Sequence, residues 1–178
     1  VDPQDPFAIA RYYEQRFKED AIALGLKVAI DERDRDPDTP SYMPRATDNI
    51  PQMKRVIERL LESGYAYPAG RAPARAIYFN VQKFAPYGSL SGNTLDQLRG
   101  GAGGRVDQSQ QSQKHHPADF LLWKEDETHK MKWDSPVVDG HEKWGKGYPG
   151  WHIECSAMAL RRLIDDDLDP AAIKGATI

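Results

Sequence analysis

The hydrophobic period of this 178-residue chain changes twice, and this limits the folds open to it. Up to residue 64 the apolar residues recur at helical spacing. Between residues 65 and 137 they form short β runs broken by turns, and helical spacing returns near residue 151. The sequence therefore predicts a mixed α and β protein divided into residues 1–64, 65–137 and 138–178.

The first helix is expected to begin at Asp5, a predicted N-cap that is followed by Pro6 in the first helical position. Gly25 is a plausible end for it. Its apolar stripe is predicted to be core rather than a binding surface; it comprises Ile9, Tyr13, Phe17, Ala21 and Leu24. Residues 31–40 alternate in charge and end in proline, so they are expected to form a solvated loop.

A second helix is expected after Asp48 or Asn49, either of which can cap it, and Gly64 is a natural residue to end it. Its predicted buried face comprises Ile50, Met53, Ile57, Leu60 and Leu61.

The best predicted strands are Ala76–Val81 and Asp119–Lys124, which are rich in aromatic and branched residues. Residues 98–117 lie between them and contain a glycine cluster and a glutamine-rich run, so a mobile loop is predicted there. The glycine cluster is not a phosphate-binding loop, because no Gly-Lys-Ser/Thr follows it.

Composition excludes several classes of protein. Cys155 is the only cysteine, which rules out an intrachain disulfide and a self-contained multi-cysteine zinc site and fits a cytosolic setting. The net charge of −3 argues against a protein whose whole surface binds nucleic acid, although local basic patches remain possible. No apolar run approaches the roughly 18 residues of a membrane span, and the N-terminus does not resemble a signal peptide.

A predicted loop over residues 139–150 contains four glycines and leads into a third helix, expected from about Trp151 to Ile164. Gly147 and Gly150 remove side chains where a ligand or another backbone must come close. Trp151 and Cys155 are four residues apart and share one face of the helix. A thiolate near a helix start is a good zinc ligand, and an indole beside it can wall a pocket.

A plainer interpretation of this helix stays open at this point. A lone cysteine on a helix is usually a small buried hydrophobe, and a tryptophan beside it usually belongs to the core. His152 and Glu154 would then simply be exposed.

The segment Gly147–Met158 resembles the Gly-Arg-Pro-Gly-Trp-His-Ile-Glu-Cys-Ser-Ala-Met signature of cysteinyl-tRNA synthetases, with Tyr148 in place of the usual arginine. Further matches follow the family's order over roughly residues 40–160. They are Pro44-Arg-Ala-Thr47, Gly64-Tyr-Ala-Tyr67, residues 84–92 (Phe-Ala-Pro-Tyr-Gly-Ser-Leu-Ser-Gly), Lys114–Lys124 and Trp133-Asp-Ser-Pro136.

The resemblance implies an α/β fold, part of a class I Rossmann-like catalytic domain. Residues 1–64 would be its helical part, residues 65–137 an inserted, mostly β connective-peptide subdomain, and residues 138–178 the return to the core. It implies a cytoplasmic ligase that activates cysteine with ATP and Mg²⁺ and transfers it to tRNA(Cys). Cys155 falls on a zinc ligand of the family, and Trp151 and Gly150 fall at the cysteine pocket. No membrane partner is implied.

Other parts of the family pattern are absent from the printed sequence. These are the His-Ile-Gly-His and Lys-Met-Ser-Lys-Ser motifs, a second zinc-ligand cysteine and a His-His-Glu segment. The resemblance therefore implies an internal piece of the catalytic domain that neither binds zinc tightly nor makes adenylate alone. Lys114, His115 and His116 stand where the family has Lys-Arg-Asn, which leaves their role open.

Three alternatives remain. The ligase of mycothiol synthesis shares the thiol-selecting signature but joins cysteine to an amino-sugar. A non-catalytic module could bind tRNA through arginines of the β region, which are Arg71, Arg75, Arg99 and Arg105. A zinc hydrolase built on His115, His116, His129 and His141 is a poor alternative, because these residues sit in predicted loops without a paired ligand motif.

Overall fold

The computed structural model describes residues 2–92 and 112–163. The predicted mobile loop therefore lies largely outside the described residues, as do Arg99, Arg105 and the expected end of the third helix at Ile164. The contacts divide the chain into two compact units, Val1–Asp48 and Asn49–Ile178, and each is described by itself. The division of the chain at residues 64 and 137 stays a prediction.

The first unit is a helical hairpin of α1 (Pro6–Ala23) and α2 (Lys27–Arg33). The predicted cap is confirmed, because the Asp5 carboxylate accepts hydrogen bonds from the backbone N–H groups of residues 7 and 8. Gly25 follows α1 with φ +75°, a conformation that favours glycine. The expectation of a loop over residues 31–40 is wrong for residues 31–33, which belong to α2.

The predicted burial of the α1 stripe is wrong for its aromatic members and for Leu24, which is 79% exposed. Tyr13 is 66% exposed and Phe17 is 55% exposed, whereas Ala21 is buried. Within this unit α2 is only 7 residues long and cannot cover the 18 residues of α1. The aromatic rings therefore lie on the surface of the unit.

A 3-10 turn (Ala46–Asn49) ends at the first residue of the second unit, and α3 (Ile50–Glu62) follows it within that unit. The predicted buried face of α3 is confirmed for Ile50, Met53, Ile57 and Leu60, and Val56 joins it. Leu61 is only half-buried. Gly64 ends the helix as expected, with φ +74°.

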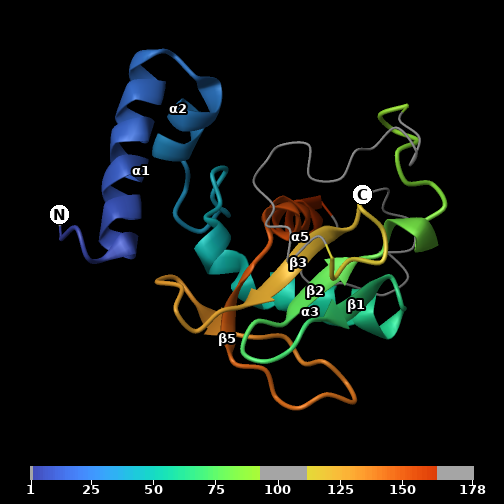
Figure 1. Cartoon of the computed structure of the whole chain (residues 1–178). Coiled ribbons are helices and arrows are strands. Elements are labelled where there is room, and N and C mark those ends of the chain that lie inside the picture. The colour runs from blue at the N-terminus through green and yellow to red at the C-terminus, as the bar shows by residue number, and fades with distance from the viewer. Residues whose placement is uncertain (1, 93–111, 164–178) are drawn as a thin grey trace. The chain divides into compact units, whose positions relative to one another are not determined.

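The described part of this unit holds one antiparallel sheet with the strand order β1-β2-β3-β5-β4 (Figure 1). The strands are β1 (Ala66–Ala69), β2 (Ala76–Phe79), β3 (Phe120–Glu125), β4 (Trp133–Asp134) and β5 (Lys146–Pro149). Both predicted strands exist, but β2 ends two residues early. Val81 begins a second 3-10 turn (Val81–Lys83), which the Asn80 side chain caps.

The expectation of a continuous loop over residues 139–150 is wrong for β5. This strand pairs with β3 on one side and with the short β4 on the other. The glycines that suggested a loop instead let β5 approach its neighbour: a Cβ on Gly147 would lie 2.0 Å from the carbonyl oxygen of Lys124.

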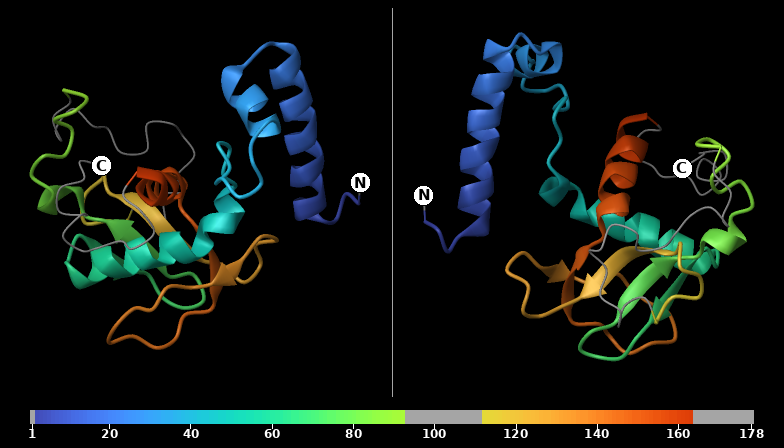
Figure 2. Two further views of the ribbon diagram at one scale, coloured as in Figure 1. Left: turned by 180° about the vertical axis from the view of Figure 1, so that it is seen from behind. Right: turned by 45° about the horizontal axis from the view of Figure 1, so that its top comes forward.

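Helices α3 and α5 (Trp151–Leu163) pack against each other and against the sheet, α5 over β3 and α3 beside β1 (Figure 2). The core between the helices and the sheet is formed by fully buried side chains, among them Met53, Ile57, Ile77, Leu122, Trp123, Ile153 and Ala157. In the described residues no helix is both long enough and apolar enough to cross a membrane.

Candidate functional site

The start of α5 is fixed against the middle of the sheet. The Gly150 N–H donates a hydrogen bond to the Leu122 carbonyl, with an N···O distance of 2.9 Å. A Cβ on Gly150 would lie 2.0 Å from the Leu121 carbonyl oxygen, well inside van der Waals contact. Gly150 is therefore required by a close backbone approach, one of the two reasons that the sequence offered. Its contact with a substrate stays a prediction.

The predicted pairing of Trp151 and Cys155 on one face of α5 is confirmed. Trp151 is 76% exposed and the Cys155 thiol is free and exposed. The opposite face of the helix carries the buried residues Ile153, Ala157 and Leu160. The burial that the plainer interpretation expects for Cys155 and Trp151 is therefore wrong in this structure: an indole and a thiol lie on the exposed side of a helix whose other side is core.

His152 and Glu154 differ from each other. His152 is exposed, and its ring centroid lies 4.7 Å from that of Phe120 at the start of β3. Glu154 is half-buried, and this burial raises the pKa of its carboxyl group above the ordinary value. The exposure expected of both residues thus holds for His152 only.

Similarity to known proteins identifies the family of the chain. A family described as the catalytic domain of class I tRNA synthetases (C) matches residues 7–171. The chain belongs to this family. It is 43% identical over 162 residues to a cysteine–tRNA ligase of Chlorobaculum tepidum, covering 90% of this chain and 28% of that protein. It is 42% identical over 158 residues to the cysteine–tRNA ligase of Synechococcus elongatus, covering 89% of this chain and 28% of that protein.

The synthetase family is consistent with the mixed helices and antiparallel sheet of the structure, and its members depend on ATP. The chain spans less than a third of the length of these relatives. One departure from the family signature now has a structural setting. Tyr148, which replaces an arginine, is half-buried in β5, and its ring centroid lies 4.2 Å from that of His129.

The described residues do not complete a zinc site around Cys155. Within residues 2–92 and 112–163, no group of three or more His, Cys, Asp or Glu side chains is placed to hold a metal ion. A structural or catalytic zinc ion needs at least three protein ligands. Among the described residues the Cys155 thiol is thus one ligand of the three or more that a zinc ion needs.

The four histidines of the hydrolase alternative are engaged separately. His129 forms a 2.6 Å hydrogen bond through Nδ1 to the Met131 carbonyl, and His116 Nδ1 accepts one from the Ala118 N–H. His115 stacks on Tyr67. His141 lines a cavity of about 200 Å³ between α3, β1 and the chain after residue 136. Neither Trp151 nor Cys155 lines this cavity.

Of the arginines in the tRNA-binding alternative, Arg75 is already engaged within the protein. Its guanidinium forms a two-point ion pair with Glu125, with N···O distances of 2.6 and 2.7 Å, and it lies over the Trp144 ring. The side chains of Arg75 and Glu125 are only 13% and 3% exposed. The Arg75 hydrogen bonds hold the pKa of Glu125 at about 2, below its ordinary 4.5. Arg71 is exposed.

Sequence reasoning missed the polar contacts that hold β5 and α5 in place. The buried Trp123 indole donates to the Ser135 hydroxyl at 2.8 Å, and this hydroxyl donates to the Gly145 carbonyl at 2.5 Å. The Gly145 N–H in turn donates to Glu125 at 2.6 Å. The match to Trp133-Asp-Ser-Pro136 marked this serine, but only the fold brings its partners to it.

Proposed function

We propose that this chain contributes the amino-acid-selecting part of a cysteine–tRNA ligase. The observation that carries the proposal is the exposed pair of Trp151 and Cys155 on α5. The names of the relatives support it, because both are cysteine–tRNA ligases. The cysteine carboxylate would attack the α-phosphate of ATP, which forms cysteinyl-adenylate and releases pyrophosphate. The cysteinyl group would then pass to a hydroxyl at the 3′ end of tRNA(Cys), with release of AMP, in the cytoplasm.

In this proposal each residue has a limited task. Trp151 forms an apolar wall for the bound cysteine, since its ring is exposed at the start of the helix. Cys155 supplies one thiolate ligand to a zinc ion whose other ligands come from elsewhere in the protein. Gly150 lines the same pocket through its backbone. Mg²⁺ would accompany ATP and is not assigned to any residue of this chain.

We also propose that residues 65–137 correspond to the inserted connective-peptide subdomain. The support is that β1, β2, β3 and β4 all fall within this range. The strand β5 follows the range and pairs with β3, so the insertion and the return to the core would share one sheet.

A chimeric enzyme tests the proposed activity directly. Residues 7–171 of this chain would replace the matching segment of the Chlorobaculum tepidum ligase, which is 43% identical over the aligned region. We expect cysteine-dependent exchange of pyrophosphate into ATP and cysteinylation of tRNA(Cys). A folded chimera without cysteine-dependent exchange would refute the proposal.

Variants on α5 make this test specific. Cys155→Ser should lower kcat/KM for cysteine by about 100-fold or more, since even indirect supports of metal ligands cost 10- to 100-fold. Ala159→Ser is the matched control, because residue 159 is exposed on the same helix one turn further on. The full-length protein supplied with tRNA or with the amino-sugar separates the two ligases: activity with the amino-sugar, and none with tRNA, would instead favour the mycothiol-type ligase.

A further inference from the structure

Lys114 and His115, which precede β3, lie over the rings of two neighbouring tyrosines. Tyr67 of β1 and Tyr78 of β2 are register partners in the sheet, with ring centroids 5.9 Å apart. The His115 ring stacks on the Tyr67 ring at 3.7 Å with only 4° between the planes. The Lys114 ammonium lies over the Tyr78 ring, 5.9 Å from its centroid. An imidazole and an ammonium are thus presented side by side; we call these four residues the stacking platform.

A buried carboxylate holds the platform in this arrangement. Asp119 is 1% exposed and accepts hydrogen bonds from the Tyr67 hydroxyl at 2.7 Å and from the His116 N–H at 3.0 Å. The Tyr67 oxygen also accepts a 2.8 Å bond from the His115 N–H. A third donor, the Val81 N–H, reaches the other Asp119 oxygen at 3.0 Å. The backbone that carries His115 is therefore fastened to the same tyrosine on which its ring stacks.

The outer surface of the platform suits a nucleotide. His115 is exposed although one ring face is covered by Tyr67, so the exposed surface is the other face and the ring edge. Bases of unpaired RNA stack on such rings, and a nearby cation takes the adjoining phosphate. Asp119 is buried and accepts three hydrogen bonds, and the Lys114 ammonium lies close enough to its negative charge to interact with it.

Two further features support a charged, hydrogen-bonding ligand. Lys114 is half-buried, and this burial lowers the pKa of its ammonium group, so a phosphate would meet a cation that is already partly stripped of water. His116 accepts a hydrogen bond at Nδ1 from the Ala118 N–H at 3.1 Å. In the neutral ring its proton is therefore on Nε2, where it can be donated.

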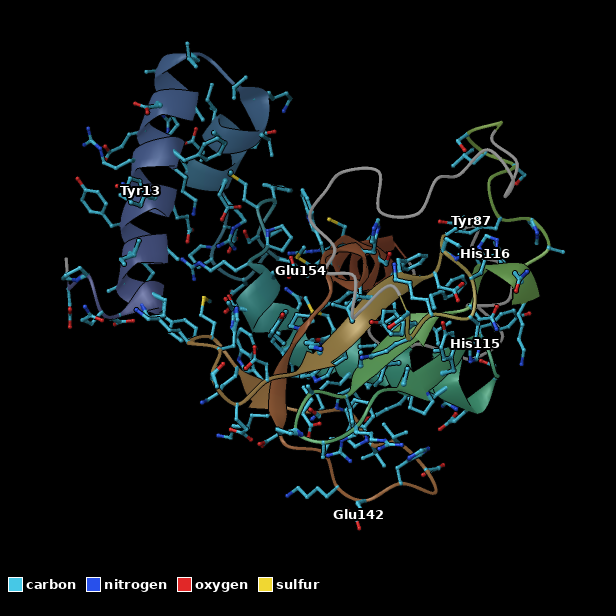
Figure 3. The ribbon with its side chains drawn as sticks, in the orientation of Figure 1. Tyr13, Tyr87, His115, His116, Glu142 and Glu154 are labelled. Carbon is cyan, nitrogen blue, oxygen red and sulfur yellow. The ribbon has the colours of Figure 1, made fainter. Side chains whose placement is uncertain are left out.

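We propose that the stacking platform binds an unpaired nucleotide of tRNA, with the base stacked on His115 and its phosphate beside Lys114. This inference rests on the proposed function for the identity of the RNA. The stacking and phosphate contacts do not depend on the proposed function, because any single-stranded RNA could make them. Figure 3 shows His115 and His116 to one side of Glu154 of α5.

Fluorescence anisotropy with a labelled adenosine pentanucleotide and the full chain tests the stacking step. We expect His115→Ala to weaken binding by roughly 5- to 100-fold, the loss of one base–ring stack. His115→Phe keeps a flat ring and should stay within about 3-fold of the wild type. His141→Ala is the matched control, because that histidine is exposed on a different loop.

The salt dependence of binding tests the phosphate contact. Lys114→Met should reduce the slope of log K against log salt by about 0.7, the value for one phosphate of a single strand. Lys143→Met, at an exposed lysine elsewhere, should leave the slope unchanged. Circular dichroism melts confirm that each variant is folded.

Three outcomes would overturn the stacking platform: no binding of the pentanucleotide by the wild type at low salt, unchanged binding by His115→Ala, or equal losses in His115→Ala and His115→Phe. Failure of the proposed function is a separate result, because cysteine-dependent pyrophosphate exchange needs no RNA. Binding of the pentanucleotide but not of a tRNA(Cys) acceptor hairpin would overturn the assignment to tRNA.

Discussion

Replacing Gly150 by alanine should strain the junction between β5 and α5. The added Cβ would lie 2.0 Å from the Leu121 carbonyl oxygen and 2.7 Å from its carbon, whereas real Cβ contacts essentially never fall below 3.0 Å. The obstacle is backbone, so a side-chain rotation cannot relieve it. The helix start must move away from β3 by about 1 Å or more, and the hydrogen bond from Gly150 to the Leu122 carbonyl is stretched or lost.

The expected loss in the free energy of unfolding is about 2–4 kcal/mol. Overpacking a close contact costs about 1–3 kcal/mol, and a backbone hydrogen bond contributes about 0.5–1.5 kcal/mol. Urea unfolding followed by tryptophan fluorescence at pH 7 measures the difference. Gly140→Ala is the control: its φ of +74° costs an alanine about 1 kcal/mol, but no atom lies within 4 Å of the added Cβ.

The comparison of these two variants decides what Gly150 does. If Gly150→Ala is no less stable than Gly140→Ala, the backbone-contact reasoning is refuted and only a direct role at the substrate remains. If it is less stable, the glycine is explained by packing, whether or not a ligand also contacts it.

Two further substitutions test the contacts behind β5. Glu125→Gln should cost about 3 kcal/mol, because the fall of the Glu125 pKa from 4.5 to about 2 beside Arg75 corresponds to that much stability. Since the folded-state pKa of Glu125 is the lower one, this stability is present above pH 4.5 and is lost as the pH falls from about 4.5 to about 2. The urea midpoint should therefore fall less across that range in the variant than in the wild type. Parallel curves of urea midpoint against pH would contradict the assignment. Ser135→Ala leaves the Trp123 N–H and the Gly145 carbonyl without their hydrogen bonds to this hydroxyl. We expect the free energy of unfolding to fall by about 2–3 kcal/mol in the same urea assay. A loss below about 0.5 kcal/mol would show that the hydroxyl bridge does not stabilise the fold.

The helices were predictable because their signals are local. Asp5 and Pro6 lie next to the turn that they start, and Gly64 lies next to the helix that it ends. The exposure of Tyr13 and Phe17 could not be predicted in the same way. Periodicity shows that a face is apolar, but only the neighbouring elements decide whether that face is covered.

The contacts that position the site join residues far apart in the sequence. Arg75 and Glu125 are 50 positions apart, and Tyr67 and Asp119 are 52 apart. Each side chain alone looks like an ordinary surface charge or strand residue. Their partners become evident only when β1, β2 and β3 lie in register.

The glycines of the family signature and its two exposed side chains have different physical explanations. A Cβ on Gly147 or Gly150 would lie only 2.0 Å from a carbonyl oxygen of β3, so the close backbone approach alone demands glycine at both positions. Nothing in the packing of the described residues demands Trp151 or Cys155, because a large apolar ring and a free thiol on an exposed face add little to stability. In the proposed function these two side chains contact the bound cysteine and the zinc ion. Gly147 and Gly150 would then set where the two side chains stand.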